Sequence, residues 1–423
     1  MIKIKTIHAR QILDSRGNPT VECEIIFSSG QVGIGVSPSG ASTGKLEAIE
    51  LRDNDEAKFN GKSVYKAVSN INTTVKKKII GCTFKNQEEF DDLLIELDGS
   101  NNKKNLGANA ILAASLAFCK AKSKFNEIEL FQSFGNGCSL PVPLMNILNG
   151  GAHANNKLDF QEFMIIPIKF PSFSASLQAG CEVFHSLKNQ LSKRSLSTAV
   201  GDEGGFAPNI SSNQQALDII SESIEIAGYT PGDDIYLGLD VASSEFFNHG
   251  EYTLNDGIYN SSDFCEYLSK LCNNYPIISI EDGMAEDDWD GWKHITNSLG
   301  NKVQLVGDDV FVTNPEILKK GIDAGIANSI LIKLNQIGTV TETIQTIDIA
   351  KQSDYTFIIS HRSGETEDTT IADLSVGTGS NQIKTGSLSR SDRVAKYNRL
   401  LRIEEKLGEN MYNTANIFKR WQK

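Results

Sequence analysis

The chain has 423 residues, and 41 Lys and Arg against 53 Asp and Glu give a formal net charge of −12 at pH 7. This balance argues against a general nucleic-acid or anionic-membrane binder, because such proteins gather Lys and Arg on one surface. No stretch approaches the roughly 20 apolar residues of a membrane span, and the start MIKIKTIHAR lacks the apolar core of a signal peptide. We therefore expect a cytoplasmic protein with no nucleic-acid partner and no membrane span. Display at the cell surface by a route without a signal stays open.

The first third of the chain predicts a small α+β domain. Residues 1–37 alternate apolar and polar positions, which predicts a three-stranded antiparallel meander, and the spacing becomes helical between Leu46 and Phe134. Strands followed by helices favour a self-contained α+β unit. The small, polar segment FGNGC at 134–138 is the best boundary, so we expect domains over 1–135 and 136–423.

The rest of the chain predicts a β/α barrel. Short apolar runs that end in polar residues recur between helical stretches, as expected of buried parallel strands. Their ends mostly recur at about 25 residues, which fits repeated βα units, and the segment NHGEYTLNDG predicts a surface hairpin inserted between two of them. Only ten residues separate Leu148 from Asp159, too few for a parallel crossover. We therefore expect the barrel to open with an antiparallel pair.

Ionisable side chains stand at the predicted strand ends, where parallel barrels carry their active sites. They are Glu162, Glu203, Asp240, Glu281, Asp308, Lys333, His361 and Lys384. A single carboxylate after a strand is usually a helix cap or a turn former. Three of them on neighbouring strands are costly without a cation, and oxygen ligands alone favour Mg²⁺.

Four further features of the sequence carry a functional and a structural interpretation. Lys333, in the apolar run ILIKLN, either pairs with those carboxylates or serves as a base, since burial can lower the pKa of Lys from about 10.4 towards 7 to 8. Glu203, in GDEGGFAP, either approaches a ligand or lies in a plain tight turn. The sequence SHRSGETED suits a phosphate or carboxylate, because Arg supplies a planar fork of donors, although it could also be an exposed turn. The small-residue loop around Ser42 is either a lid or merely flexible, and a lone histidine such as His153, in a second loop of this kind, is usually just a solvated loop residue.

A series of segments closely resembles the enolase family, in order and from end to end. The segments are DSRGNPT, PSGASTG, NGGAHANN, QEFM, GDEGGFAP, LDVASSEF, SIEDGMAEDDW, VGDDVFVTNP, LIKLNQIGT, SHRSGETED and IKTGSLSRSDR. The resemblance implies reversible dehydration of 2-phosphoglycerate to phosphoenolpyruvate, the step of glycolysis and gluconeogenesis. It also implies an α/β fold in which an N-terminal α+β domain caps an eight-stranded TIM-like barrel of ββαα(βα)₆ order. A homodimer is the expected assembly, and an octamer stays open.

The resemblance also implies residue roles. Asp240, Glu281 and Asp308 would hold a structural Mg²⁺, and Ser42 would bind a second, catalytic Mg²⁺. Lys333 would take the C2 proton, and Glu203 would protonate the leaving C3 hydroxyl. Glu162 would support Glu203, and the closeness of the two carboxylates should raise the pKa of Glu203. The residues implied in substrate binding are His153, Glu162, His361, Arg362, Ser363 and Lys384.

Two other functions remain open at this point. A related barrel racemase or lactonising enzyme shares the metal-enolate strategy, but such enzymes typically carry a K-x-K base pair at the second strand end, where this chain has QEFM. A non-catalytic binding or structural role is a different class, and the intact set of acid, base and metal residues suggests that such a role would be additional. A coupled assay with 2-phosphoglycerate and Mg²⁺ separates these readings.

Overall fold

The N-terminal part of the molecule is a small antiparallel sheet. The computed structural model describes residues 1–41, 43–408, 411–412 and 417–422. The predicted meander is present, and a short fourth strand joins it to give the order β3-β2-β1-β4. The strands are β1 (Ile2–Leu13), β2 (Pro19–Phe27), β3 (Val32–Val36) and β4 (Thr83–Phe84).

Helices cover one face of this sheet. They bury the alternating apolar positions of β2, and the rings of Phe90 and Phe118 stack 4.3 Å apart in the core between the layers. The longest of these N-terminal helices, α4, lies so close to β3 that a Cβ atom on Gly33 or Gly35 would collide with its backbone. The helices are α1 (Tyr65–Asn70), α2 (Lys76–Ile79), α3 (Gln87–Asp98) and α4 (Ala108–Phe125), with a π-helical turn at Ile71–Val75.

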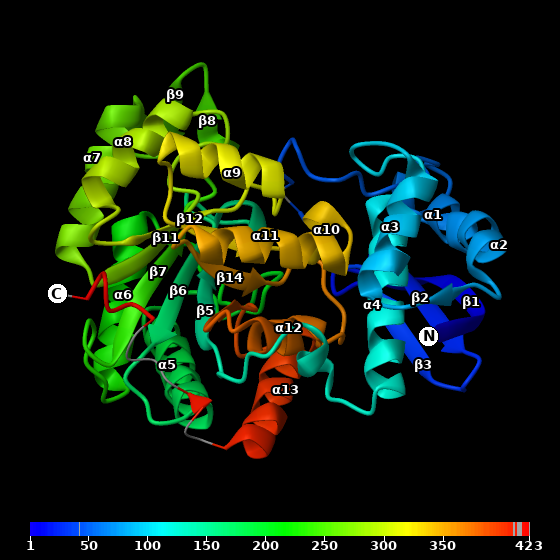
Figure 1. Cartoon of the computed structure of the whole chain (residues 1–423). Helices are drawn as coiled ribbons and strands as arrows, with labels where there is room; N and C mark the ends of the chain where they lie inside the picture. The colour runs from blue at the N-terminus through cyan, green and yellow to red at the C-terminus, as the bar shows by residue number, and fades with distance from the viewer. Residues whose placement is uncertain (42, 409–410, 413–416, 423) are drawn as a thin grey trace.

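The second part is a closed barrel of eight strands, as expected (Figure 1). The strands are β5 (Val142–Asn149), β6 (Glu162–Pro167), β7 (Ile235–Asp240), β11 (Ile277–Glu281), β12 (Gln304–Gly307), β13 (Ser329–Ile332), β14 (Thr356–Ser360) and β15 (Gln382–Lys384). The predicted antiparallel opening pair is confirmed by β5 and β6. Strand β6 is also antiparallel to β7, while the other neighbours are parallel. Strand β6 therefore runs against the other seven.

Helices surround the barrel in the ββαα(βα)₆ order. They are α5 (Phe173–Lys193), α6 (Asn213–Ile226), α7 (Ser261–Asn274), α8 (Trp289–Leu299), α9 (Pro315–Ala324), α11 (Val340–Gln352), α12 (Thr370–Thr378) and α13 (Ser391–Leu407), with a short extra turn α10 (Leu334–Ile337). The predicted hairpin insertion is a small sheet of β8 (Phe247–Asn248), β9 (Glu251–Leu254) and β10 (Gly257–Tyr259). No helix of the described residues is both long and apolar enough to cross a bilayer.

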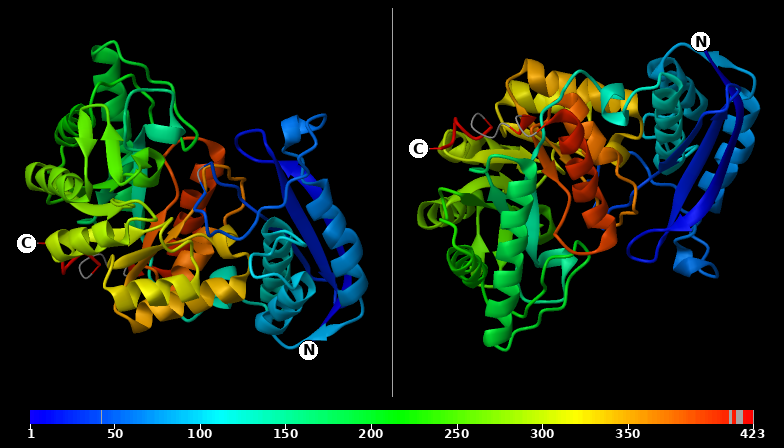
Figure 2. Two further views of the ribbon diagram at one scale, coloured as in Figure 1. Left: turned by 90° about the horizontal axis from the view of Figure 1, so that it is seen from above. Right: turned by 90° about the horizontal axis from the view of Figure 1, so that it is seen from below.

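The chain after β3 connects the small sheet to the barrel, and Figure 2 shows this blue segment reaching across the gap between them. Ser39 and Gly364 exchange backbone hydrogen bonds of 2.8 Å in both directions. The backbone N–H of Ala48 donates to the carbonyl of Gln336, 2.9 Å away. The N-terminal part therefore sends one segment over an end of the barrel.

We expect Gly35→Ala to destabilise the N-terminal part. The added methyl group would meet the backbone of α4 at Ala113 and Ala117, and overpacking of this kind costs about 2 kcal/mol. Chemical denaturation measures the change. The matched control is Ile34→Ala on the same strand, whose side chain is 41% exposed and should matter little. Equal losses for the two variants would show that the close approach of α4 is not what stabilises this strand.

Candidate active site

The ionisable residues predicted from the sequence converge on one mouth of the barrel. They surround a cavity of about 20 Å³ that is lined by Gly40, Ala41, His153, Gln161, Glu162, Glu203, Asp240, Lys333, Ser360, His361, Arg362, Ser363 and Lys384. Glu281 and Asp308 join this group through ion pairs with the two lysines. Ser42 lies outside the described residues. A larger cavity of about 640 Å³ lies between the small sheet and residues 365–369, but its lining contains none of the predicted site residues.

The ammonium group of Lys384 is the centre of the cluster. Lys384 ends β15, and its Nζ lies 2.9 Å from Asp240 Oδ2, 2.8 Å from Glu281 Oε2 and 3.1 Å from Glu162 Oε1. The side chain is buried, which alone would lower its pKa, but these carboxylates raise the pKa of Lys384 well above its usual value. Lys384 is therefore a fixed positive charge.

The reversal of β6 explains why Glu162 belongs to this mouth. The sequence placed it with the carboxyl ends of the strands, but the structure shows it at the first residue of β6. Because β6 is antiparallel to β7, its beginning lies beside the end of β7, and Glu162 pairs in register with Asp240. Glu162 therefore lies at the predicted mouth, although it begins its strand and does not end it.

Lys333 forms the second cationic point. It follows β13, and its Nζ pairs with Asp308 Oδ2, while Gln336 donates to Asp308 Oδ1 over 2.9 Å. Burial lowers the pKa of Lys333, but Asp308 outweighs this effect and the pKa lies above its usual value. The lowered pKa considered from the sequence is therefore wrong for this arrangement, because the lysine has a carboxylate partner.

Glu203 lies in the loop between α5 and α6 and does not follow a barrel strand, contrary to expectation. The only ladder contacts near it, among the described residues, are isolated bridges from Phe206 to Val200 and Leu148. A Cβ atom on Gly204 would collide with the backbone of Ser389, at a φ of +87° that disfavours other residues. The glycines of this segment therefore press the loop against the protein and fix Glu203 over the mouth.

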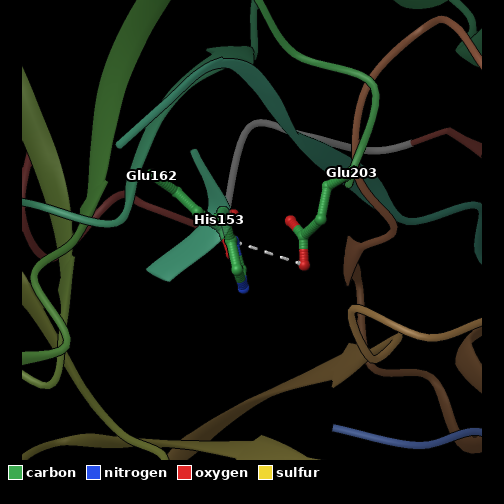
Figure 3. A group of neighbouring side chains, drawn as sticks. All are labelled: His153, Glu162 and Glu203. Carbon is green, nitrogen blue, oxygen red and sulfur yellow. Dashed lines mark ion pairs between the residues drawn. The ribbon is translucent and has the colours of Figure 1, made fainter. Parts of the chain in front are cut away.

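Figure 3 shows His153 between Glu162 and Glu203. Its Nδ1 lies 3.7 Å from an oxygen of each carboxylate, and the ligand atoms of the three side chains lie within 4.8 Å of one another. On its other side, Glu203 Oε2 lies 3.4 Å from His361 Nε2 and accepts a 3.0 Å hydrogen bond from Asn146. Two carboxylates and two imidazoles thus share one buried region.

The proton distribution in this region differs from the sequence expectation. Burial, and then the charge of Glu203, raise the pKa of Glu162 well above its usual range. Burial opposes the ionisation of Glu203 as well, but His361 and His153 hold the pKa of Glu203 well below its usual range. Burial lowers the pKa of His361 to about 3 and also lowers that of His153. The crowding of two carboxylates does raise one pKa, but that of Glu162, not of Glu203.

The donor set fits a hard cation. Burial, and then Asp240, raise the pKa of Glu281 well above its usual range, so the lysines do not compensate all of the negative charge. Lys384 bridges Asp240 and Glu281, while the ligand atoms of Asp308 cluster within 4.8 Å of those of Asp282 and Asp309. All of these donors are carboxylate oxygens, which Mg²⁺ prefers.

Several residues that the sequence analysis missed hold the predicted ones. Asp282 accepts the backbone N–H groups of Asp308 and Asp309 at 2.9 and 3.0 Å, which fixes the turn that carries a predicted metal ligand. Arg393 is fully buried and donates to the carbonyls of Arg362 and Ser363. The acidic pair was visible in SIED and Arg393 ends the segment IKTGSLSRSDR, but the sequence assigned a role to neither Asp282 nor Arg393.

The architecture and the gathered ionisable groups define a β/α-barrel enzyme. Residues 137–421 match the enolase C-terminal TIM barrel domain, and residues 4–134 match the enolase N-terminal domain. The chain therefore belongs to the enolase family. The family is that of hydro-lyases that dehydrate 2-phosphoglycerate, and it is Mg²⁺-dependent in general.

We expect Mg²⁺ to raise the thermal unfolding temperature, because an ion that binds only the folded state stabilises it, by about 2.7 kcal/mol at a concentration 100 times the Kd. Glu281→Gln removes a predicted ligand and should abolish most of this rise. The matched control is Glu222→Gln, a surface carboxylate paired with Arg194, which should leave the rise intact. The same Mg²⁺ effect in the two variants would place the ion elsewhere.

Proposed function

We propose that this protein is a Mg²⁺-dependent enzyme that interconverts 2-phosphoglycerate and phosphoenolpyruvate in glycolysis and gluconeogenesis. In this proposal Lys333 removes the C2 proton and Glu203 protonates the C3 hydroxyl as it leaves. The observation that carries it is that these two side chains, from distant segments, line one small cavity together with Arg362 and Ser363. One substrate can thereby meet a base, an acid and an anion-binding corner of the cavity, the corner formed by Arg362 and Ser363.

The difficult step is the removal of a proton next to a carboxylate, because it creates an enolate with two negative charges. A Lys or His base combined with one or two Mg²⁺ ions is the established pattern of enolase-superfamily sites. Asp240, Glu281 and Asp308 would hold one ion, which would supply positive charge beside the substrate carboxylate. Lys384 adds a fixed ammonium to the same region, so that the developing charge meets positive charge already in place.

The acid step uses the paired carboxylates. Burial and the charge of Glu203 raise the pKa of Glu162 well above its usual range, and Glu203 is the carboxylate flanked by both imidazoles. His153 lies at 3.7 Å from each carboxylate, so it couples their protonation. We propose that this pair delivers one proton to the leaving hydroxyl through Glu203, with Glu162 as its reserve.

The remaining assignments rest on the family resemblance. We propose that Ser42 binds a second Mg²⁺ and that His153, His361, Arg362 and Ser363 hold the substrate. A homodimer in the cytoplasm and a domain boundary at residue 135 belong to the same proposal. The racemase alternative loses support from Gln161, the first residue of QEFM, since its amide donates to Asp240 Oδ2 over 3.2 Å and cannot act as a base.

Turnover of 2-phosphoglycerate with Mg²⁺, followed as formation of phosphoenolpyruvate, tests the function directly. The roles are then separated by exchange of the C2 proton with solvent deuterium. Lys333→Ala should lose both turnover and exchange, each by about a hundredfold or more, whereas Glu203→Gln should lose turnover and retain exchange.

The control is Lys319→Ala, a lysine paired with Glu316 on the surface of α9, which should retain both activities. Exchange that survives in Lys333→Ala and vanishes in Glu203→Gln would mean that the base and the acid are reversed. Absence of phosphoenolpyruvate with the unmodified protein would reject the reaction itself.

A further inference from the structure

Arg362, the arginine at the anion-binding corner, already has an anionic partner within the chain. Its Nη1 lies 3.0 Å from Glu47 Oε2, and its Nη2 donates to Glu47 Oε1 over 3.2 Å. Nη1 also donates to Asn335 Oδ1 at 2.9 Å. The side chains of Arg362 and Glu47 are only 3% and 9% exposed, so this bidentate ion pair is shielded from water. Shielded bidentate pairs of this kind are among the strong ones.

Glu47 belongs to the segment that crosses from the small sheet to the barrel. Its Oε1 accepts from the backbone N–H of Gly44 at 3.1 Å and from Gln336 Nε2 at 3.3 Å. The neighbouring Ala48 is tied to the carbonyl of Gln336, as described above. The carboxylate is therefore oriented towards Arg362 from several sides, and its position is not that of a loosely held surface group.

The pair stands where an incoming phosphate would have to bind. The cavity beside Arg362 measures about 20 Å³, which is room for about one water molecule, since roughly 10–15 Å³ of such volume holds one. A phosphorylated three-carbon acid cannot enter while the segment holds this position. Phosphate and carboxylate oxygens use the same planar donors of a guanidinium, so both anions compete for Arg362.

The surroundings favour the release of Glu47 once another anion arrives. Glu47 lies close to another carboxylate, since Gln336 Nε2 donates both to Glu47 Oε1 at 3.3 Å and to Asp308 Oδ1 at 2.9 Å. Arg362 is the favourable partner that offsets this like-charge repulsion. An anion that takes Arg362 leaves Glu47 with the hydrogen bonds from Gly44 and Gln336 but without the charge that offsets its acidic neighbour, which favours movement of the carboxylate away from the mouth.

We propose that Glu47 is a specificity-determining residue, an internal anion that occupies Arg362 until the phosphate group of the substrate displaces it. The inference rests on the proposed function in that it takes Arg362 as the phosphate-binding residue. Displacement requires an anion that binds Arg362 better than a carboxylate already in place. A dianionic phosphate meets this requirement, and a weakly bound monoanion does not. Glu47 therefore sets the affinity for Arg362 that an incoming anion must exceed, and this requirement favours phosphate esters.

The test is the binding of inorganic phosphate, measured by titration calorimetry at pH 8, where phosphate is mainly a dianion. Glu47→Gln keeps the shape of the side chain but removes its charge, so phosphate should bind roughly tenfold more tightly than to the unmodified protein. In steady-state assays the KM for 2-phosphoglycerate should fall while kcat does not rise. Glu47→Ala, which also removes the hydrogen bonds, should tighten phosphate binding in the same direction.

The matched control is Glu50→Gln. Glu50 lies three residues further along the same segment, but it pairs with Arg52 at 2.7 Å and accepts from Ser39 at 3.0 Å. The Glu50→Gln substitution removes the same charge but leaves the contacts of Arg362 in place, so the affinity for phosphate should stay unchanged. Thermal unfolding verifies that all variants are folded.

Unchanged or weaker phosphate binding by Glu47→Gln would overturn the proposal, and so would an equal gain in Glu50→Gln. Phosphate binding needs no turnover, so this result is independent of whether the protein dehydrates 2-phosphoglycerate. If the unmodified protein fails the turnover assay but Glu47→Gln still binds phosphate tenfold more tightly, only the proposed reaction is rejected. The role of Glu47 as an internal anion then still holds.

Discussion

The burial of several carboxylates around one ammonium group is the constraint on which this structure depends. Lys384 contacts three of them, from β6, β7 and β11, at the point where these strands meet. Removing charges from water is expensive, and a network of this kind contributes little to stability by itself. The apolar interior of the barrel and its surrounding helices, the largest buried cluster in the described chain, must therefore stabilise a mouth that is electrostatically unfavourable. Such a mouth is suited to bind cations and to hold protons at unusual pKa values.

The same constraint divides the mouth into two regions with different protonation. Around Lys333 the positive charge has a carboxylate partner, Asp308, so the lysine keeps its proton in the substrate-free protein. Around His153, burial and the charge of Glu203 raise the pKa of Glu162, although Lys384 lies 3.1 Å from that carboxyl group. In the proposed reaction, Lys333 must give up its own proton before it can accept the C2 proton, and Glu203 must receive a proton before it can donate one. Arg393 joins the regions, because it donates to the carbonyls of both Asp202 and Ser363.

The sequence predicted those features that follow from local pattern. Apolar runs with polar ends located the barrel strands, and the short connection after Leu148 predicted the antiparallel opening that β5 and β6 confirm. The pattern could not show that β6 also runs against β7, because a buried strand reads the same in both directions. The pKa directions of Glu203 and Lys333 were also out of reach, since each depends on side-chain distances between segments far apart in the chain. The role predicted for Ser42 stays a prediction, because this residue lies outside the described ranges.

The small domain contributes a charged side chain, Glu47, to the barrel mouth, and the sequence pattern did not indicate this contribution. A buried guanidinium at the barrel mouth needs a counter-charge before substrate arrives, because an unpaired buried charge is strongly destabilising. The barrel provides Asn335 as a neutral partner for Arg362, and the segment from the small sheet provides Glu47 as the anion. That segment follows β3, whose glycines lie directly against α4, so the anion is carried by a closely packed support. The Arg362–Glu47 ion pair therefore acts together with the backbone contacts Ser39–Gly364 and Ala48–Gln336 to hold this segment over the barrel mouth.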